Sequence, residues 1–245
     1  MSAPEVRTYD DADALAQAVG NALIDATIQA QRARGDAHLV LTGGGVGIAL
    51  LAALRTSPRA SGIDWARVHL WWGDERFVPE GDPDRNDTQA RDALLDHVPL
   101  DPAHVHPMPV PGVSLVDAAA AYADELRREA PAGSDLPEFD VLLLGMGPEG
   151  HVASLFPDSA AVHAAGTVVA VPDSPKPPPE RISLTLPALR SARSVWLVTA
   201  GSAKAEAVAR CVAPGTDPVD LPAAGARGRE STLLWVDREA AALLG

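Results

Sequence analysis

Apolar residues occur along the chain in two patterns, one with the spacing of a helix and one in short runs rich in β-formers. Helical spacing is found in residues 10–34, 48–57, 86–98, 115–130 and 202–212. The short apolar runs, which we predict to be strands, are residues 38–42, 68–76 (ending in a charged loop), 139–147, 168–173, 194–201 and 231–237. Because strands that alternate with helices form parallel sheets, the pattern predicts an α/β fold, an open and mostly parallel sheet with helices on both faces.

Proline- and glycine-rich segments interrupt this pattern without dividing it. They lie around residues 79–86, 107–112 and 213–228, and helix and strand signals continue on both sides with no shift in composition. The segment SPKPPPER, residues 174–181, predicts an extended polyproline backbone rather than a helix. We therefore expect residues 1–245 to form a single domain.

Composition and charge narrow the function classes. Apolar residues make up 47% of the chain, enough for a substantial core, and the net charge of −13 disfavours nucleic acid or an anionic membrane as a partner. Cys211 is the only cysteine, so the chain can form no intrachain disulfide and no thiolate metal cluster. The N-terminal residues lack a signal-peptide pattern and no uncharged apolar run approaches membrane length, so we expect a soluble, cytoplasmic protein.

Clusters with candidate chemistry follow four of the predicted strands, at residues 43–47, 73–76, 145–151 and 200–204. The carboxyl ends of parallel strands meet at one edge of a sheet, so we expect one shared cleft there. The turn at Gly43, Gly44 and Gly45 offers backbone N–H groups to an anion, although a tight turn without a ligand gives the same pattern. In GDER an extended backbone puts Asp74 and Arg76 on one side, and a solvated loop with a local ion pair is the alternative.

Residues 145–150, GMGPEG, have the G-x-G-x-x-G pattern of dinucleotide-binding turns. Such a turn needs a long crossover helix after its third glycine, and only HVASLF stands before Pro157. Asp173 nearly fits the acidic position about 20 residues further on, but the missing helix excludes a dinucleotide. We interpret the turn as one that presents His151, whose neutral imidazole, with an ordinary pKa near about 6.5, can take a proton from water.

Two further pairs of side chains could bind an ion. Arg181 and Lys204 are either solvated surface cations or, if they reach the shared cleft, a guanidinium fork and an ammonium for a phosphate dianion. His104 and His106 have the H-x-H spacing of metal ligands. Prolines surround this pair and its sequence neighbours offer no obvious third ligand, so we expect no zinc site.

Five segments, in this order, resemble motifs of the glucosamine-6-phosphate isomerase/6-phosphogluconolactonase family, and of its lactonases in particular. They are LTGGG, WWGDERFVP, GMGPEGHVASLFP, KPPPERISLTLPAL and TAGSAKAEAV. The five segments lie between about residues 39 and 211, and the resemblance as a whole extends over almost the whole chain. In the related deaminases the histidine is followed by I-A-F-N-E-P, with a carboxylate that VASLFP lacks, and this difference favours lactone hydrolysis.

The resemblance implies hydrolysis of 6-phospho-D-glucono-1,5-lactone to 6-phosphogluconate in the oxidative pentose phosphate pathway, without a metal or organic cofactor, by a monomer or weak homodimer. It implies that His151 is the general base, that Arg76 offsets the charge developing on the lactone oxygen, and that Asp74 holds Arg76 or His151 in position. It implies that the phosphate is held by Gly43, Gly44, Gly45, Arg181 and Lys204. Glu149 is the fourth candidate catalytic residue, one that would orient His151, and it stands where the family has Asp. Gly45 also departs from the family pattern, since it stands where the family has Ser. A sugar-phosphate deaminase or isomerase of the same fold and a non-catalytic sugar-phosphate sensor are the alternatives.

Overall fold

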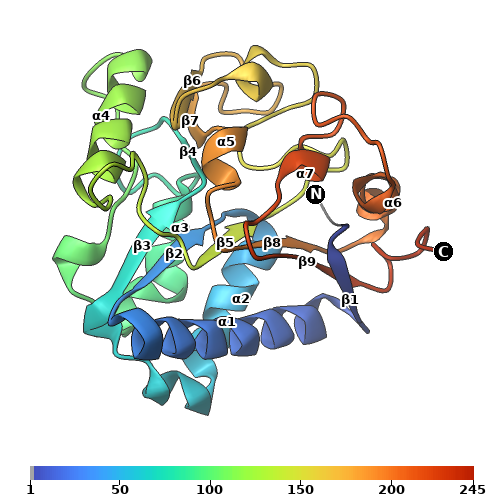
Figure 1. The fold of residues 1–245 in the computed structure, drawn as a ribbon, viewed down its shortest axis with the longest axis horizontal. Coiled ribbons are helices and arrows are strands. Elements are labelled where there is room, and N and C mark those ends of the chain that lie inside the picture. Colours follow the sequence, from blue (N-terminus) through green and yellow to red (C-terminus); the bar gives the residue numbers. More distant parts are fainter. Residues whose placement is uncertain (1–2) are drawn as a thin grey trace.

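A six-stranded sheet, in which every neighbouring pair of strands is parallel, forms the centre of the protein (Figure 1). The computed structural model describes residues 3–245. In spatial order the strands are β1 (Glu5–Tyr9), β9 (Ser231–Asp237), β8 (Ser194–Thr199), β5 (Val141–Leu144), β2 (Ala37–Leu41) and β3 (Val68–Trp72). The predicted parallel α/β sheet is therefore confirmed, with β1 as an edge strand that the apolar pattern did not reveal.

A second, antiparallel sheet of three strands was not predicted. It consists of β4 (Asp74–Arg76), β7 (Arg181–Leu184) and β6 (Val168–Val171), with β7 in the middle. The chain passes between the sheets at Gly73, whose N–H donates to Leu41 O (3.1 Å) while its carbonyl accepts from Leu184 N (2.8 Å). Residues 74–76 are thus a strand, and the expectation of a charged loop there was wrong.

Helices cover both faces of the main sheet, as the sequence predicted. They are α1 (Ala12–Arg34), α2 (Gly44–Thr56), α3 (Asn86–Ala93), α4 (Leu115–Arg128), α5 (Leu186–Leu189), α6 (Ala205–Val212) and α7 (Pro222–Gly225). In Figure 1, α1 and α2 lie below the sheet, while α4, α5 and the small antiparallel sheet lie above it. Among residues 3–245, no helix combines the length and the apolar character that a membrane crossing requires.

The core follows from these two covered faces. Strands buried on both sides are largely apolar, and β3 and β5 have no exposed position. The chain has few aromatic residues, and three of them, Trp71, Trp72 and Trp235, are fully buried and fill a large part of the core. The segment 174–181 forms no helix, but it is not extended either, because it folds back around the side chain of Arg181.

Candidate active site

Side chains from four strand ends and from β7 surround one cleft of about 190 Å³. Its lining residues are Thr42, Gly43, Gly44, Asp74, Arg76, Asn86, Gly145, Met146, Gly147, His151, Ala153, Arg181 and Lys204. The sheet therefore brings together the clusters that the sequence analysis placed at its edge. Two of the expected site residues are not part of the lining: Gly45, which follows Gly44 in the chain, and Glu149, which lies 3.0 Å from His151.

The turn after β5 presents His151. Gly147 N–H donates to His151 O (3.0 Å) and Gly150 N–H to Gly147 O (2.9 Å), which closes the turn, and Gly150 has φ +90°. A Cβ on Gly147 would lie 2.0 Å from His151 Nδ1, so the imidazole packs directly over a residue that has no side chain. The ring of Phe156 stacks against the imidazole from another side, with centroids 4.5 Å apart.

A carboxylate lies beside the imidazole of His151, and an ammonium holds that carboxylate. Its Nδ1 lies 3.0 Å from Glu149 Oε1, in an orientation that does not suit a hydrogen bond, so the contact is electrostatic. Lys176 Nζ holds Glu149 at 2.8 and 3.1 Å. Burial raises the pKa of Glu149, but Lys176 and His151 outweigh it and lower that pKa to about 2.

The imidazole itself is poised as a base. Burial lowers the pKa of His151 from its ordinary value, with the charge of Glu149 acting in the opposite direction. The ring is therefore neutral at neutral pH and has a lone pair to accept a proton. Lys176 was missed in the sequence analysis, since nothing in a proline-rich segment indicated that its side chain turns back to Glu149.

Two arginines face the cleft from adjacent strands. The β4–β7 register pairs Arg76 with Arg181, and like charges opposite each other destabilise a sheet unless an anion lies between them. Arg181 is 5% exposed, and its Nε and Nη2 donate to the carbonyl oxygens of residues 176–178 at 3.0–3.2 Å. Burial and the charge of Arg76 lower the pKa of Arg181. The rigid Arg181 guanidinium keeps Nη1 for a ligand, which suits an anionic group.

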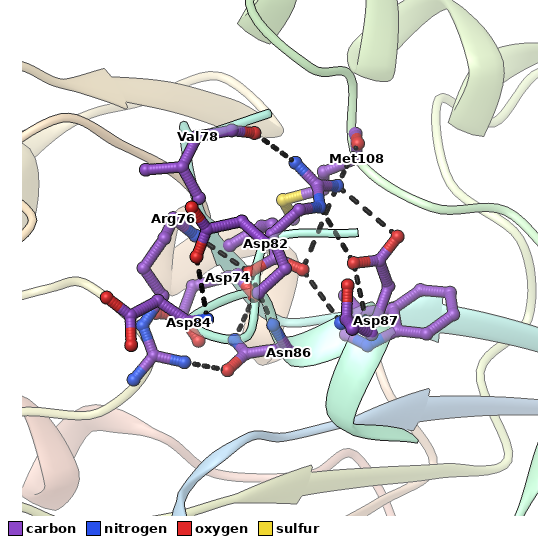
Figure 2. A network of polar contacts seen from close by, with 12 residues as sticks. Asp74, Arg76, Val78, Asp82, Asp84, Asn86, Asp87 and Met108 are labelled. Atoms are coloured by element: carbon purple, nitrogen blue, oxygen red, sulfur yellow. Dashed lines mark hydrogen bonds and ion pairs between the residues drawn. The ribbon is translucent and has the colours of Figure 1, made fainter. Parts of the chain in front are cut away.

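Asn86 fixes the position of Arg76. Figure 2 shows the two side chains turned toward each other, with Arg76 Nη1 donating to Asn86 Oδ1. Asn86 Nδ2 donates in turn to Asp74 O (2.8 Å). A Cβ on Gly43 would lie 1.8 Å from Asn86 Oδ1, so the first glycine of the turn is required by this amide. Asn86 was missed because its only sequence signal is its place at the start of a predicted helix.

Glu75 attaches β4 to the beginning of α3, on the side opposite to the cleft. Its carboxylate is fully buried and accepts the backbone N–H groups of Arg76 (2.8 Å), Asn86 (2.7 Å) and Asp87 (2.9 Å). Burial raises the pKa of Glu75 to about 7, while these N–H groups and Arg85, at 3.9 Å, favour the charged form. The prediction that Asp74 and Arg76 share one side of the backbone is thus confirmed by the cleft lining.

The carboxylate of Asp74 has a different partner from the two expected. Ser154 Oγ donates to Asp74 Oδ2 at 2.6 Å, whereas we expected Asp74 to hold Arg76 or His151. Ser154 follows Ala153, a cleft residue with φ +50°, a conformation that non-glycine residues adopt at a cost of about 1–3 kcal/mol. Asp74 therefore secures the segment after His151 and adds its negative charge beside that ring.

The turn at the start of α2 and Lys204 form the wall of the cleft that an anion can approach. Gly44, with φ +82°, begins α2 and leaves backbone N–H groups at the helix N-terminus. A Cβ on Gly45 would meet no heavy atom within 4 Å, so this position has room for the family's serine. Lys204, just before α6, also lines the cleft, and burial together with the charge of Lys176 lowers its pKa.

Fold and cleft together define a class, an α/β protein with an imidazole base and several cations gathered at the carboxyl ends of its strands. Within that class, the chain belongs to the family of glucosamine-6-phosphate isomerases/6-phosphogluconolactonase, which it matches over residues 10–235. The family resemblance inferred from the motifs is therefore confirmed.

Particular members are similar over nearly their whole length. The chain is 52% identical to the 6-phosphogluconolactonase of Streptomyces coelicolor, over 98% of this chain and 95% of that protein. It is 53% identical to the 6-phosphogluconolactonase of Mycobacterium tuberculosis, over 98% of both. The solved 6-phosphogluconolactonase of Trypanosoma brucei superposes with a TM-score of 0.85 at 26% identity and complete coverage of both chains. A monomeric glucosamine-6-phosphate deaminase, 20% identical with a TM-score of 0.80 over 98% and 99% of the chains, shares the fold.

Proposed function

We propose that this protein hydrolyses 6-phospho-D-glucono-1,5-lactone to 6-phosphogluconate. The observation that carries the proposal is the neutral imidazole of His151, which faces a cleft also lined by Arg76, Arg181 and Lys204. Relatives that are 52% and 53% identical over nearly the whole chain bear the name of this lactonase, which supports the same substrate here. A lactone is an activated acyl group, so a base and an oxyanion partner suffice for its hydrolysis, without metal or organic cofactor.

Water attacks the C1 carbonyl of the lactone while His151 removes its proton. A bond from the water oxygen to C1 forms, and the carbonyl becomes an oxyanion whose charge the guanidinium of Arg76 offsets. The C1–O5 bond then breaks, and the imidazolium of His151 returns its proton to the departing ring oxygen. The products are the C5 hydroxyl and the C1 carboxylic acid of 6-phosphogluconate, which ionises to the carboxylate and releases one proton to solvent.

The phosphate is bound at a distance from this chemistry. We assign it to the Gly43–Gly45 turn, Arg181 and Lys204, which supply backbone N–H groups, a guanidinium edge and an ammonium. Binding the non-reacting end of the substrate fixes C1 against the water that His151 activates. Asn86 and Asp74 act as positioning residues, since Asn86 holds Arg76 and Asp74 holds the segment after His151 through Ser154.

The test is a direct comparison of two substrates. Freshly prepared 6-phosphogluconolactone should be consumed well above its spontaneous rate, measured by the acid released, and glucosamine 6-phosphate should yield no ammonia. Ammonia release would establish the deaminase alternative, which the shared fold leaves open. Tight binding of 6-phosphogluconate without any acceleration of lactone hydrolysis would point to a non-catalytic sensor instead.

A further inference from the structure

Four histidine rings are stacked at the opposite end of the main sheet from the cleft. His38 of β2 lies opposite His69 of β3, and the segment containing His104 and His106 bridges to the outer side of β3. The ring of His69 is stacked between His38 and His104, with centroid separations of 4.3 and 3.9 Å. His69 precedes Asp74 by five residues, about 16 Å along an extended chain, so this cluster is separate from the proposed active site.

Two of these rings have the separation of ligands on one metal ion. His69 Nδ1 lies 3.2 Å from His106 Nε2. Two imidazole nitrogens at about 2.0–2.1 Å from a tetrahedral zinc ion are about 3.3–3.4 Å apart. A carboxylate oxygen of Glu129, at the end of α4, lies within 4.8 Å of one ring nitrogen of each histidine, and this residue is exposed and free to adjust. The third ligand that the sequence neighbours of His106 did not offer is thus supplied by β3 and α4.

The protonation pattern around His106 favours a metal ligand. His106 Nδ1 is 2.9 Å from Glu125 Oε1, so Nδ1–H donates to the carboxylate and the lone pair of Nε2 points toward His69. A carboxylate that orients a ligating histidine in this way is the usual second partner in metal sites. Moving the His69 proton from Nδ1 to Nε2 would expose both lone pairs to one ion.

We propose that His69, His106 and Glu129 bind one divalent first-row transition-metal ion, zinc foremost, with water as the fourth ligand. Two imidazoles and one carboxylate are a ligand set that zinc accepts in tetrahedral geometry. The ion joins β3, the 104–106 segment and the end of α4, so its role is structural. Because the folded chain binds it, the ion raises the free energy of unfolding.

Calorimetric titration of chelator-treated protein with zinc chloride tests this site. The parent for this titration is the His151→Gln chain, in which the cleft imidazole cannot bind zinc, and every further substitution is made in it. We expect the parent to bind one zinc ion per chain. His69→Gln and His106→Gln should abolish binding, and Glu129→Gln should weaken it at least tenfold. Glu125→Gln should weaken it by about 10- to 100-fold, as is typical for the partner of a ligating histidine.

His104→Gln is the matched control, because His104 stacks on His69 while its Nδ1 is bonded to Ala66 O at 2.9 Å. It should retain zinc binding within a factor of about three, whereas a clamp made by His104 and His106 would lose it. Far-ultraviolet circular dichroism of each metal-free variant checks its folding, and the exposed Glu129→Gln provides a test that does not disturb packing. The proposal is overturned if the parent chain binds no zinc, if Glu129→Gln binds as tightly as the parent, or if His104→Gln alone abolishes binding.

Discussion

Replacing Gly147 with alanine should disable the enzyme while leaving the fold intact. The added Cβ would lie 2.0 Å from His151 Nδ1, 2.2 Å from its Cε1 and 2.7 Å from Glu149 Oε2. Even a tight contact of about 3.0 Å requires the imidazole to retreat by about 1 Å. Displacements of this size at a catalytic group cost about 10²-fold in rate. We therefore expect kcat for lactone hydrolysis to fall about 100-fold, with a much smaller change in KM, since the phosphate contacts stay in place.

The assay is the initial rate of acid release from fresh lactone at neutral pH, corrected for spontaneous hydrolysis. Gly166→Ala is the matched control, because the Cβ at that position would approach no atom more closely than 3.9 Å and φ is not positive there. The control should keep the parent kcat. A Gly147→Ala enzyme that melts like the parent and keeps its kcat within a factor of about two would refute the placement of His151 over Gly147 as the basis of catalysis.

Three further predictions concern charge. Because burial lowers the pKa of His151 and a base must be deprotonated to act, kcat/KM should be flat near pH 7 and fall only below about pH 6.5. Since the charge of Glu149 raises the pKa of His151, Glu149→Gln should move the inflection of the pH profile to lower pH. An upward shift of the inflection would contradict the assignment of His151 as the general base. Lys204→Ala should raise KM for the phosphorylated lactone and leave hydrolysis of unphosphorylated gluconolactone unaffected; equal effects on both substrates would remove Lys204 from the phosphate site. Arg85 is fully buried and donates to Asp87 Oδ1 (2.7 Å) and to two backbone carbonyls. Arg85→Met should therefore lower the free energy of unfolding, measured by urea titration, by about 3–5 kcal/mol. A loss below about 1 kcal/mol would show that the Arg85–Asp87 ion pair contributes little to stability.

Periodicity and the rule for parallel sheets were enough to predict five of the six strands of the main sheet, all but β1, and the edge at which the candidate site segments meet. β5 is an unbroken apolar run because both of its faces are covered, and β8 is apolar between its first and last residues. A candidate site segment follows each strand directly, from Gly145 after β5 and from Ala200 after β8. Once the strands are parallel, their carboxyl ends share an edge, so the meeting of distant loops required no knowledge of side-chain positions.

The short antiparallel sheet was not predictable in the same way. β4 is three residues long, polar and continuous with β3 in sequence, and only the hydrogen bonds of Gly73 to both sheets separate the two strands. Asn86 and Lys176 escaped notice for a related reason. Their importance arises from partners far away in sequence, Arg76 and Gly43 for Asn86 and Glu149 for Lys176, and a local pattern contains no trace of such contacts.

The central claim is that the imidazole of His151 activates water inside a cleft whose cations hold the phosphate, and the kinetics of His151→Ala test it most directly. General base catalysis is worth about 10²–10⁴-fold, so kcat for 6-phosphogluconolactone at neutral pH should fall by that factor while KM stays near the parent value. Turnover by the folded His151→Ala enzyme at the parent rate would contradict the account.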